Sequence, residues 1–230
     1  INYPDLLNNH YKIREREKMN IGKDWLTRLS QMVTTQIIPK FHYRKFKQFL
    51  DGGFSVMENI ILHFNPLVTC YINWYEDAVK QEIQLGSLSS KDRILVIGSG
   101  SIPATTIVLS QLTNAHISSI DKNKQAVINA KRCMQQVIPN AKIRFIHSNA
   151  IDLDLSNFTA IILIYGVENT QGILKHCYDN SNNKTKIIVR SEKDSLININ
   201  KYFLIKKYVN NYSIGPFQSM LLLKKEKKTN

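Results

Sequence analysis

The sequence predicts an α/β fold: a Rossmann-like sheet with late antiparallel strands, preceded by a small all-helical N-terminal domain. Three observations predict it. Before residue 90, apolar residues recur at helical spacing. After residue 90, short aliphatic runs alternate with helical segments, which is typical of a parallel sheet. The last two apolar runs, 202–208 and 218–223, have no convincing helix between them, so we expect an antiparallel pair.

The N-terminal domain is predicted to contain four helices. Apolar spacing supports helices over 25–37 and 42–50, and the second of these ends at a pair of glycines. Ser55 and Glu58 resemble a capping box that opens a third helix. A longer fourth helix is predicted over 67–85. The small and polar residues that follow it are the best boundary, so we predict a helical domain over 1–88 and a sheet domain over 89–230.

The sheet domain begins with a strand–turn–helix–strand unit. A buried strand is predicted over 93–97, a helix over 104–112 and a second strand over 116–120. The remaining elements continue the alternation: strands over 142–147, 160–165 and 185–189, and helices over 123–137 and 168–178.

A glycine turn joins the first strand to its helix. Gly98, Ser99 and Gly100 allow a sharp turn and close approach of a ligand, and Pro103 fits the first turn of the helix. Ile102 and Pro103 stand where a dinucleotide-binding turn carries its third glycine. Close approach of a pyrophosphate needs that glycine, whereas an adenosyl group joined to an amino acid does not. The turn therefore favours S-adenosylmethionine over a nicotinamide dinucleotide.

An acidic residue follows the turn at the expected distance. Asp121 ends the second strand about twenty residues after the glycines, where a carboxylate meets the two hydroxyls of a bound ribose. The alternative is that Asp121 only caps the helix that begins nearby. Both interpretations remain open at this point.

The other candidate donor contacts lie in loops after the strands, because ligands bind outside the carboxyl ends of open α/β sheets. Asn149 is a candidate for hydrogen bonds to adenine, Ala150 offers its backbone N–H, and Tyr165 is a candidate for contact with the amino-acid end of the donor. Each is equally open to a simpler interpretation as a loop or core residue. The complete set of these loop candidates is Lys122, Asn149, Ala150, Tyr165 and Gly166.

Two glutamates stand out in the fourth predicted helix. Glu76 lies on an apolar stripe, and Glu82 shares a neighbouring stripe with Tyr71 and Tyr75. A carboxylate on a buried face tends to have a raised pKa, which suits a general base. The alternative is a solvated helix in which Glu76 pairs with Lys80 four residues on.

Composition limits the class of protein. The 230 residues contain no apolar run long enough to span a membrane, and the three cysteines are odd in number and widely spaced. We therefore expect a cytoplasmic protein without disulfides or a protein-bound metal. The formal net charge of +13 falls mostly after residue 90. Scattered surface lysines explain it most simply, so a nucleic-acid partner is possible but not favoured.

Three segments resemble a known family. They are VIGSGSIPATTIVL at the turn, the aromatic-rich YINWYED before it, and IIVRSEKDSL at the fifth strand. Together they resemble the nicotianamine synthase-like family, and most of all the bacterial staphylopine-type metallophore aminobutanoyltransferases. The resemblance covers about residues 67–191 and implies a class I S-adenosylmethionine-dependent transferase fold. Two segments depart from the family pattern: charged residues follow Arg190-Ser191, and Tyr165-Gly166-Val167-Glu168 replaces an aliphatic loop.

The resemblance implies transfer of the 3-amino-3-carboxypropyl group of S-adenosylmethionine to an amine of an amino-acid acceptor, histidine or similar, with release of methylthioadenosine. It implies Glu76 as the base with Glu82 in reserve, Tyr71 or Tyr75 orienting the amine, and Arg190 holding a carboxylate. The alternatives are a methyltransferase acting on a small molecule or RNA, and a non-catalytic nucleic-acid-binding module. A homodimer remains possible.

Overall fold

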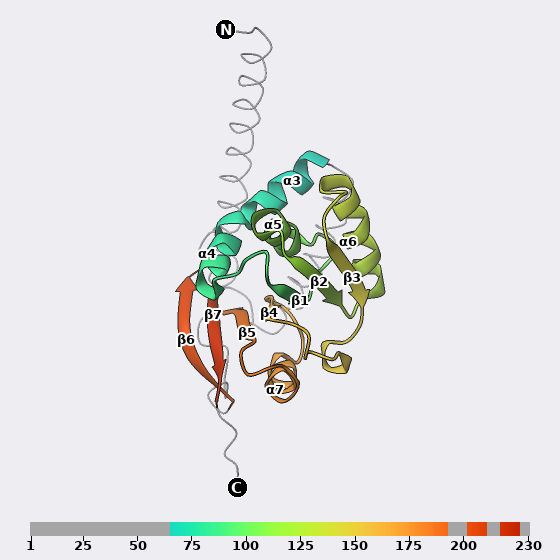
Figure 1. The fold of residues 1–230 in the computed structure, drawn as a ribbon. Helices are drawn as coiled ribbons and strands as arrows, with labels where there is room; N and C mark the ends of the chain where they lie inside the picture. The colour runs from blue at the N-terminus through green and yellow to red at the C-terminus, as the bar shows by residue number, and fades with distance from the viewer. Residues whose placement is uncertain (1–64, 193–201, 211–216, 226–230) are drawn as a thin grey trace, which may run out of the picture.

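The computed structural model describes residues 65–192, 202–210 and 217–225. Within these residues the chain forms one seven-stranded sheet of order β3-β2-β1-β4-β5-β7-β6 (Figure 1). The helices predicted over 25–37 and 42–50 and after Ser55 lie outside the described residues. The strands are β1 Arg93–Ile97, β2 His116–Asp121, β3 Ile143–His147, β4 Ala160–Leu163, β5 Lys186–Glu192, β6 Phe203–Asn210 and β7 Phe217–Lys224.

Strand direction changes at one side of the sheet. Strands β3, β2, β1, β4 and β5 pair in parallel, while β7 pairs antiparallel with both β5 and β6. This confirms the Rossmann-like class with its late antiparallel strands. The carboxyl ends of the five parallel strands meet at one edge, which is where such sheets bind ligands.

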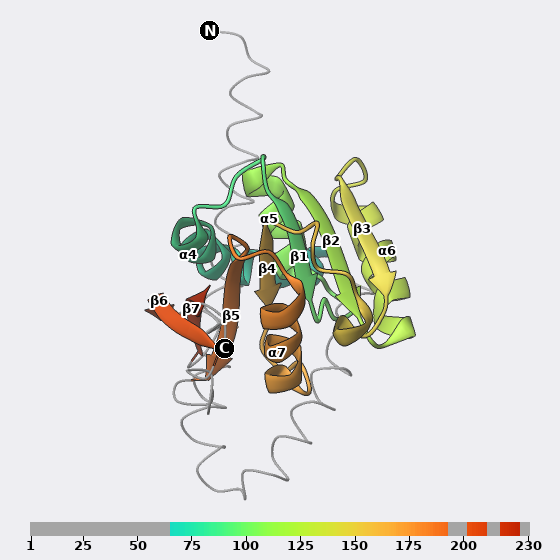
Figure 2. The same cartoon turned by 60° about the horizontal axis from the view of Figure 1, so that its bottom comes forward.

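The sheet lies between two helical layers. On one face lie α3 Asn65–Trp74, α4 Glu76–Gly86, α5 Ala104–Thr113 and α6 Lys124–Val137, and on the other lies α7 Thr170–Asn180 (Figures 1 and 2). Alternate residues of each strand face opposite layers. In β4, for example, Ile162 belongs to the core under α5 and Ile161 to the core under α7. Both faces are apolar, as buried parallel strands require.

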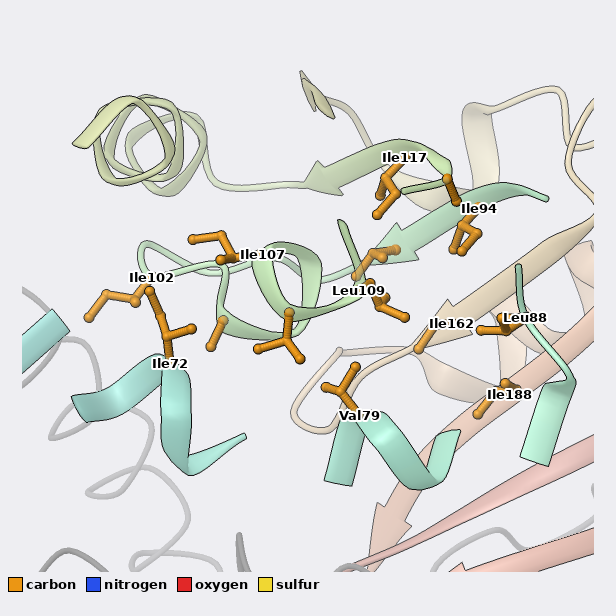
Figure 3. Packing of buried hydrophobic residues seen from close by; sticks show 14 of the residues in the cluster. Ile72, Val79, Leu88, Ile94, Ile102, Ile107, Leu109, Ile117, Ile162 and Ile188 are labelled. Carbon is orange, nitrogen blue, oxygen red and sulfur yellow. The ribbon is translucent and has the colours of Figure 1, made fainter. Parts of the chain in front are cut away.

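The helix predicted over 67–85 is in fact two helices, because the chain bends at Tyr75. The N–H of Tyr75 donates to the carbonyl of Ile72 at 3.1 Å, three residues back instead of four, and α4 starts at the next residue. The bend lets both helices pack on α5. Ile72 of α3 and Val79 of α4 point toward Ile107 of α5 and its neighbours (Figure 3).

Several strand ends differ from the prediction, and two of these differences bear on the site. Strand β4 ends at Leu163, two residues earlier than predicted. Strand β5 continues from Val189 to Glu192, because β7 pairs with it over its whole outer part. The extension places Arg190 inside the sheet, opposite Ser219.

The described part of the helical segment packs directly on the sheet domain, since α4 contacts α5, β5, β6 and β7. The division into domains at residue 88 stays a prediction. Of the helices that the structure describes, none is both long and apolar enough to cross a membrane.

Candidate active site

The glycine turn after β1 has the backbone that only glycine adopts easily. Gly98 and Gly100 have φ of +91° and +64°. The N–H groups of Gly98 and Ser99 both donate to the carbonyl of Ile120 in β2, at 2.9 and 3.1 Å. A Cβ on Gly98 would lie 2.4 Å from Cγ2 of Val167, so the loop after β4 packs directly on the turn. The turn is therefore fixed from both neighbouring strands.

Asp121 reaches back to the turn. Its Oδ2 accepts the N–H of Gly100 at 2.9 Å, and its Oδ1 accepts the N–H of Asn123 at 2.9 Å. The cap of α6 is Asn123, whose side chain accepts from Gln125 and Ala126. A carboxylate accepts about four hydrogen bonds, so Asp121 keeps capacity for two further donors such as ribose hydroxyls.

Ser99 carries a buried polar atom with unused hydrogen-bonding capacity. The residue is 5% exposed, and its Oγ has no hydrogen-bond partner in the structure. Buried hydroxyls are normally satisfied, so such an atom beside a close-approach turn fits a polar group of a bound ligand. Ile102 and Pro103, which follow in the chain, are also buried. Pro103 is the residue just before α5, whereas the sequence suggested that it lies in the first turn of the helix.

The loops that carry the other candidates are linked to one another and, through Asp121 and Val167, to this turn. The Ser148 N–H donates to the Asp121 carbonyl, and the His147 ring contacts the Lys122 carbonyl, so the loops after β2 and β3 are joined. In the short 3₁₀ turn Ala150–Asp152, Ala150 is buried, and Asn149 before it is exposed. Lys122 forms an exposed ion pair with Glu168 of the loop after β4.

Tyr165 and Gly166 belong to that same loop. Gly166 is exposed with φ of +87°, and Tyr165 is 38% exposed. The Tyr165 ring packs against Phe217 at the start of β7, with ring centroids 4.3 Å apart and the rings tilted by 40°. The loop thus reaches across the end of β5.

Glu76 makes the contact that the solvated-helix alternative predicts. Its Oε1 lies 2.7 Å from Nζ of Lys80, and its side chain is 34% exposed. The pair raises the pKa of Lys80 through hydrogen bonding and charge attraction. A role for Glu76 as base stays a prediction.

Glu82 and Arg190 bind each other in the core. Nε and Nη2 of Arg190 donate to Oε1 and Oε2 of Glu82 at 2.9 and 2.8 Å, and the two side chains are 2% and 0% exposed. Arg190 also donates to Thr105 Oγ1 at 3.2 Å, and Ser219 Oγ donates to Glu82 at 2.6 Å. Burial alone lowers the pKa of Arg190, but the Glu82 carboxylate outweighs burial, so the pKa is raised.

This pairing changes what the sequence suggested for both residues. Arg190 is buried, and the carboxylate that it holds belongs to Glu82 of the chain instead of a ligand. Glu82 is fully buried and already accepts three hydrogen bonds. Any direct contact of either residue with a substrate stays a prediction.

The two predicted tyrosines lie beside this pair. The Tyr75 ring centroid is 5.7 Å from Cζ of Arg190, and the Tyr75 and Tyr71 hydroxyls are 3.2 Å apart. Tyr71 is buried and Tyr75 half-buried, and Trp74 packs against both rings. The structure thus brings Tyr71, Tyr75, Glu82 and Arg190 together.

Sequence reasoning missed three residues that shape this region. Thr105 and Ser219 are buried polar residues of the Glu82–Arg190 group, and a polar residue within an apolar strand was the signal for Ser219. Phe217, which packs on Tyr165, gave no signal because it looks like an ordinary apolar residue. Val167, which packs on the turn, lies in the loop that the sequence already singled out. Among residues 65–192, 202–210 and 217–225, no group of three His, Cys, Asp or Glu could hold a metal.

No protein-family model matches the sequence. Two curated proteins are similar over part of it. One is the carboxy-S-adenosyl-L-methionine synthase of Nautilia profundicola, 23% identical over 175 residues, which are 70% of this chain and 74% of that protein. The other is the L-histidine 2-aminobutanoyltransferase of Yersinia pestis, 24% identical over 120 residues, which are 52% of this chain and 45% of that protein.

Solved structures share the fold. A point mutant of the nicotianamine synthase MtNAS in complex with S-adenosylmethionine superposes with a TM-score of 0.68 and 17% identity, covering 79% of this chain and 76% of that one. An RNA methyltransferase from Salinibacter ruber in complex with S-adenosyl-L-homocysteine superposes with a TM-score of 0.54 and 13% identity, covering 67% and 95%. The chain therefore has the Rossmann-like class I fold of the nicotianamine synthase-like S-adenosylmethionine-dependent transferases, the family that its glycine turn resembles in sequence.

Proposed function

We propose that the protein is an S-adenosylmethionine-dependent transferase. The observation that carries this is the glycine turn with the Asp121 carboxylate hydrogen-bonded to the Gly100 N–H, at the carboxyl edge of a sheet of this order. The unpartnered Ser99 hydroxyl supports a ligand with polar groups there. Both curated relatives and the MtNAS complex support the same donor, since the relatives are named for chemistry on S-adenosylmethionine or for aminobutanoyl transfer.

We propose further that the group transferred is the 3-amino-3-carboxypropyl group and that the acceptor is an amine of an amino acid such as histidine. The amine lone pair forms a bond to the γ-carbon of the donor's methionine part, and the carbon–sulfur bond breaks with its electron pair going to sulfur. Methylthioadenosine leaves, and a base takes the proton that the amine loses. Attack at this CH2 is hindered, so the protein must contribute mainly by positioning. The similarity to the L-histidine 2-aminobutanoyltransferase supports this choice.

Product analysis tests the proposal. We expect purified protein, given S-adenosylmethionine and mixed amino acids, to release methylthioadenosine. Release of S-adenosylhomocysteine alone would contradict aminocarboxypropyl transfer and support a methyltransferase. Donor binding without turnover would indicate that the mixture lacks the right acceptor. The assay would then be repeated with single amino acids and with RNA. Failure to bind the donor at all would contradict the proposal as a whole.

The methyltransferase is the second candidate. The fold shared with the Salinibacter RNA methyltransferase and the formal charge of +13 support it, with RNA as the acceptor. Steep loss of RNA affinity with rising salt is expected in that case.

Of the two glutamates, we propose Glu76 as the base. Its side chain is one-third exposed and only Oε1 lies in the ion pair with Lys80, whereas Glu82 is fully enclosed. We expect Glu76→Gln to lower turnover by about 100-fold or more, the usual contribution of a general base, with donor affinity unchanged. Lys80→Met is the matched control, because it breaks the same ion pair and leaves the carboxylate. Equal turnover in Glu76→Gln and the wild type would contradict the role.

A further inference from the structure

The buried Glu82–Arg190 pair connects four elements of the molecule. Glu82 lies in α4, Arg190 in β5, and the guanidinium also contacts Thr105 in the first turn of α5. Ser219 of β7 completes the group by donating to Glu82. Every contact is a hydrogen bond of 2.6 to 3.2 Å between buried side chains. Charged groups this deeply buried hold one geometry, because any other arrangement leaves a charge without a partner.

The group lies between the donor turn and the aromatic residues of the helical segment. Thr105 is two residues after Pro103, so the guanidinium contacts the helix that starts directly from the glycine turn. On its other side, the same guanidinium lies 5.7 Å from the ring centroid of Tyr75, a distance typical of a cation–π contact. Tyr75 in turn contacts the Tyr71 hydroxyl.

Tyr75 needs such a support because it lies at the bend between α3 and α4. The residue makes no regular helical bond at its N–H, and its side chain is only half-buried. Its ring contacts the guanidinium and also the rings of Tyr71 and Trp74, whose centroids are 5.2 and 5.9 Å away.

We propose that Arg190, held in place by Glu82, is a positioning residue that fixes Tyr75 relative to the glycine turn and so sets the acceptor side of the site. This inference rests on the proposed function. Arg190 acts through Tyr75 and takes no part in the bond-making step.

The test replaces both charges at once. Single removal of Glu82 or Arg190 leaves the other charge buried and alone, which threatens the fold. A Glu82→Met/Arg190→Met variant avoids this, because apolar replacement of a buried pair is often tolerated. Asp92→Asn/Lys186→Met is the matched control, since this pair joins the start of β5 to the segment before β1, at the edge of the sheet opposite the carboxyl ends.

We expect the Glu82→Met/Arg190→Met variant to bind S-adenosylhomocysteine within about threefold of the wild type, while turnover falls by about 10- to 100-fold and the acceptor KM rises. Arg190→Lys should retain more turnover than the double variant. Lysine keeps the positive charge but lacks the planar guanidinium that binds both carboxylate oxygens. The Asp92→Asn/Lys186→Met control should have a lower melting temperature than the wild type. Its turnover should be unchanged at temperatures where it is folded. Unchanged turnover and acceptor KM in a folded Glu82→Met/Arg190→Met variant would overturn the inference.

A second measurement does not depend on activity. In a Trp25→Phe background, Trp74 is the only tryptophan, and it packs on the Tyr75 ring. We expect acrylamide to quench Trp74 at least twofold faster in the Glu82→Met/Arg190→Met variant than in the control pair. Equal quenching in the two would overturn the inference even if the wild type proves inactive, and absent donor binding in the wild type would instead contradict the proposed function.

Discussion

Gly98 tolerates little change, because two independent constraints act on it. Its φ of +91° strains any residue with a side chain, and a Cβ would lie 2.4 Å from Val167. Gly166 offers a matched comparison, since its φ is +87° but nothing lies within 4 Å of its Cβ position.

We therefore expect Gly98→Ala to lower the free energy of unfolding by more than Gly166→Ala, whose backbone strain alone costs about 1–2 kcal/mol. Urea denaturation measures both. Gly98→Ala in a Val167→Ala background should recover the steric part of the loss but not the backbone part. Equal destabilisation by Gly98→Ala and Gly166→Ala would show that the contact with Val167 is easily relieved.

Asp121 is expected to act on donor binding more than on folding. Its carboxylate faces the glycine turn, while Asn123 caps α6. Asp121→Asn should weaken S-adenosylhomocysteine binding by about 10- to 100-fold, as expected for the loss of a charged hydrogen-bond acceptor worth about 1.5–3 kcal/mol. Asn123→Ala should instead lower stability by about 1 kcal/mol, the usual effect of losing a helix cap.

Isothermal titration with S-adenosylhomocysteine and thermal melts separate the two effects. Unaltered affinity in Asp121→Asn would mean that this carboxylate only stabilises the glycine turn and does not contribute to donor binding.

At the scale of elements, a polar cluster fixes the amino ends of the strands. Asp92, just before β1, accepts hydrogen bonds from Ser89 and from the Thr159 hydroxyl, and Lys186 at the start of β5 pairs with it at 3.1 Å. Burial by itself raises the pKa of Asp92, but the hydrogen bonds and the charge of Lys186 outweigh it, so the pKa lies below its ordinary value of 3.8. The cluster ties the segment after α4 to the sheet.

The stabilisation by Asp92 should depend on pH. A carboxyl with a lowered folded-state pKa contributes its full stability above its unfolded-state pKa and loses it as the pH falls through the folded-state value. We expect Asp92→Asn to cost about 1–3 kcal/mol at pH 7. The difference from the wild type should shrink on acidification below about pH 4. Denaturant titrations at several pH values measure it, and a difference independent of pH would contradict the role of the charge.

At the scale of the whole molecule, the two apolar cores on either side of the sheet each contain a buried cysteine. Cys133 of α6 lies in the core under α5, and Cys177 of α7 in the core on the other face. Burial raises the pKa of Cys177 to about 12, so almost no reactive thiolate exists at neutral pH.

We expect a thiol reagent to label Cys133 and Cys177 only when the molecule unfolds. A Cys70→Ser variant restricts the signal to these two residues. Their labelling rates should rise together with denaturant, since both layers pack on one sheet and should open cooperatively. Labelling of Cys177 well before Cys133 would show instead that α7 opens independently of the rest.

The order of helices and strands was predictable from the sequence because it depends on local patterns. Aliphatic runs marked β1, β2 and the later strands, and the glycine turn and Asp121 were recognised by their spacing alone. These features depend on residues within about twenty positions of one another. The role of a polar turn residue such as Asp121 stayed ambiguous, because a helix cap and a ligand contact have the same local sequence pattern.

What the tertiary structure decided is the partner of each buried charge. Glu82 and Arg190 are 108 residues apart, and the periodicity of α4 showed only that Glu82 lies on an apolar stripe. The strand β7 decided their pairing by extending β5 and bringing Ser219 opposite Arg190. The bend at Tyr75 likewise follows from packing on α5, since nothing in the local sequence interrupts the helix. Local propensity fixes which element forms, but a buried charge is satisfied only by what the fold brings to it.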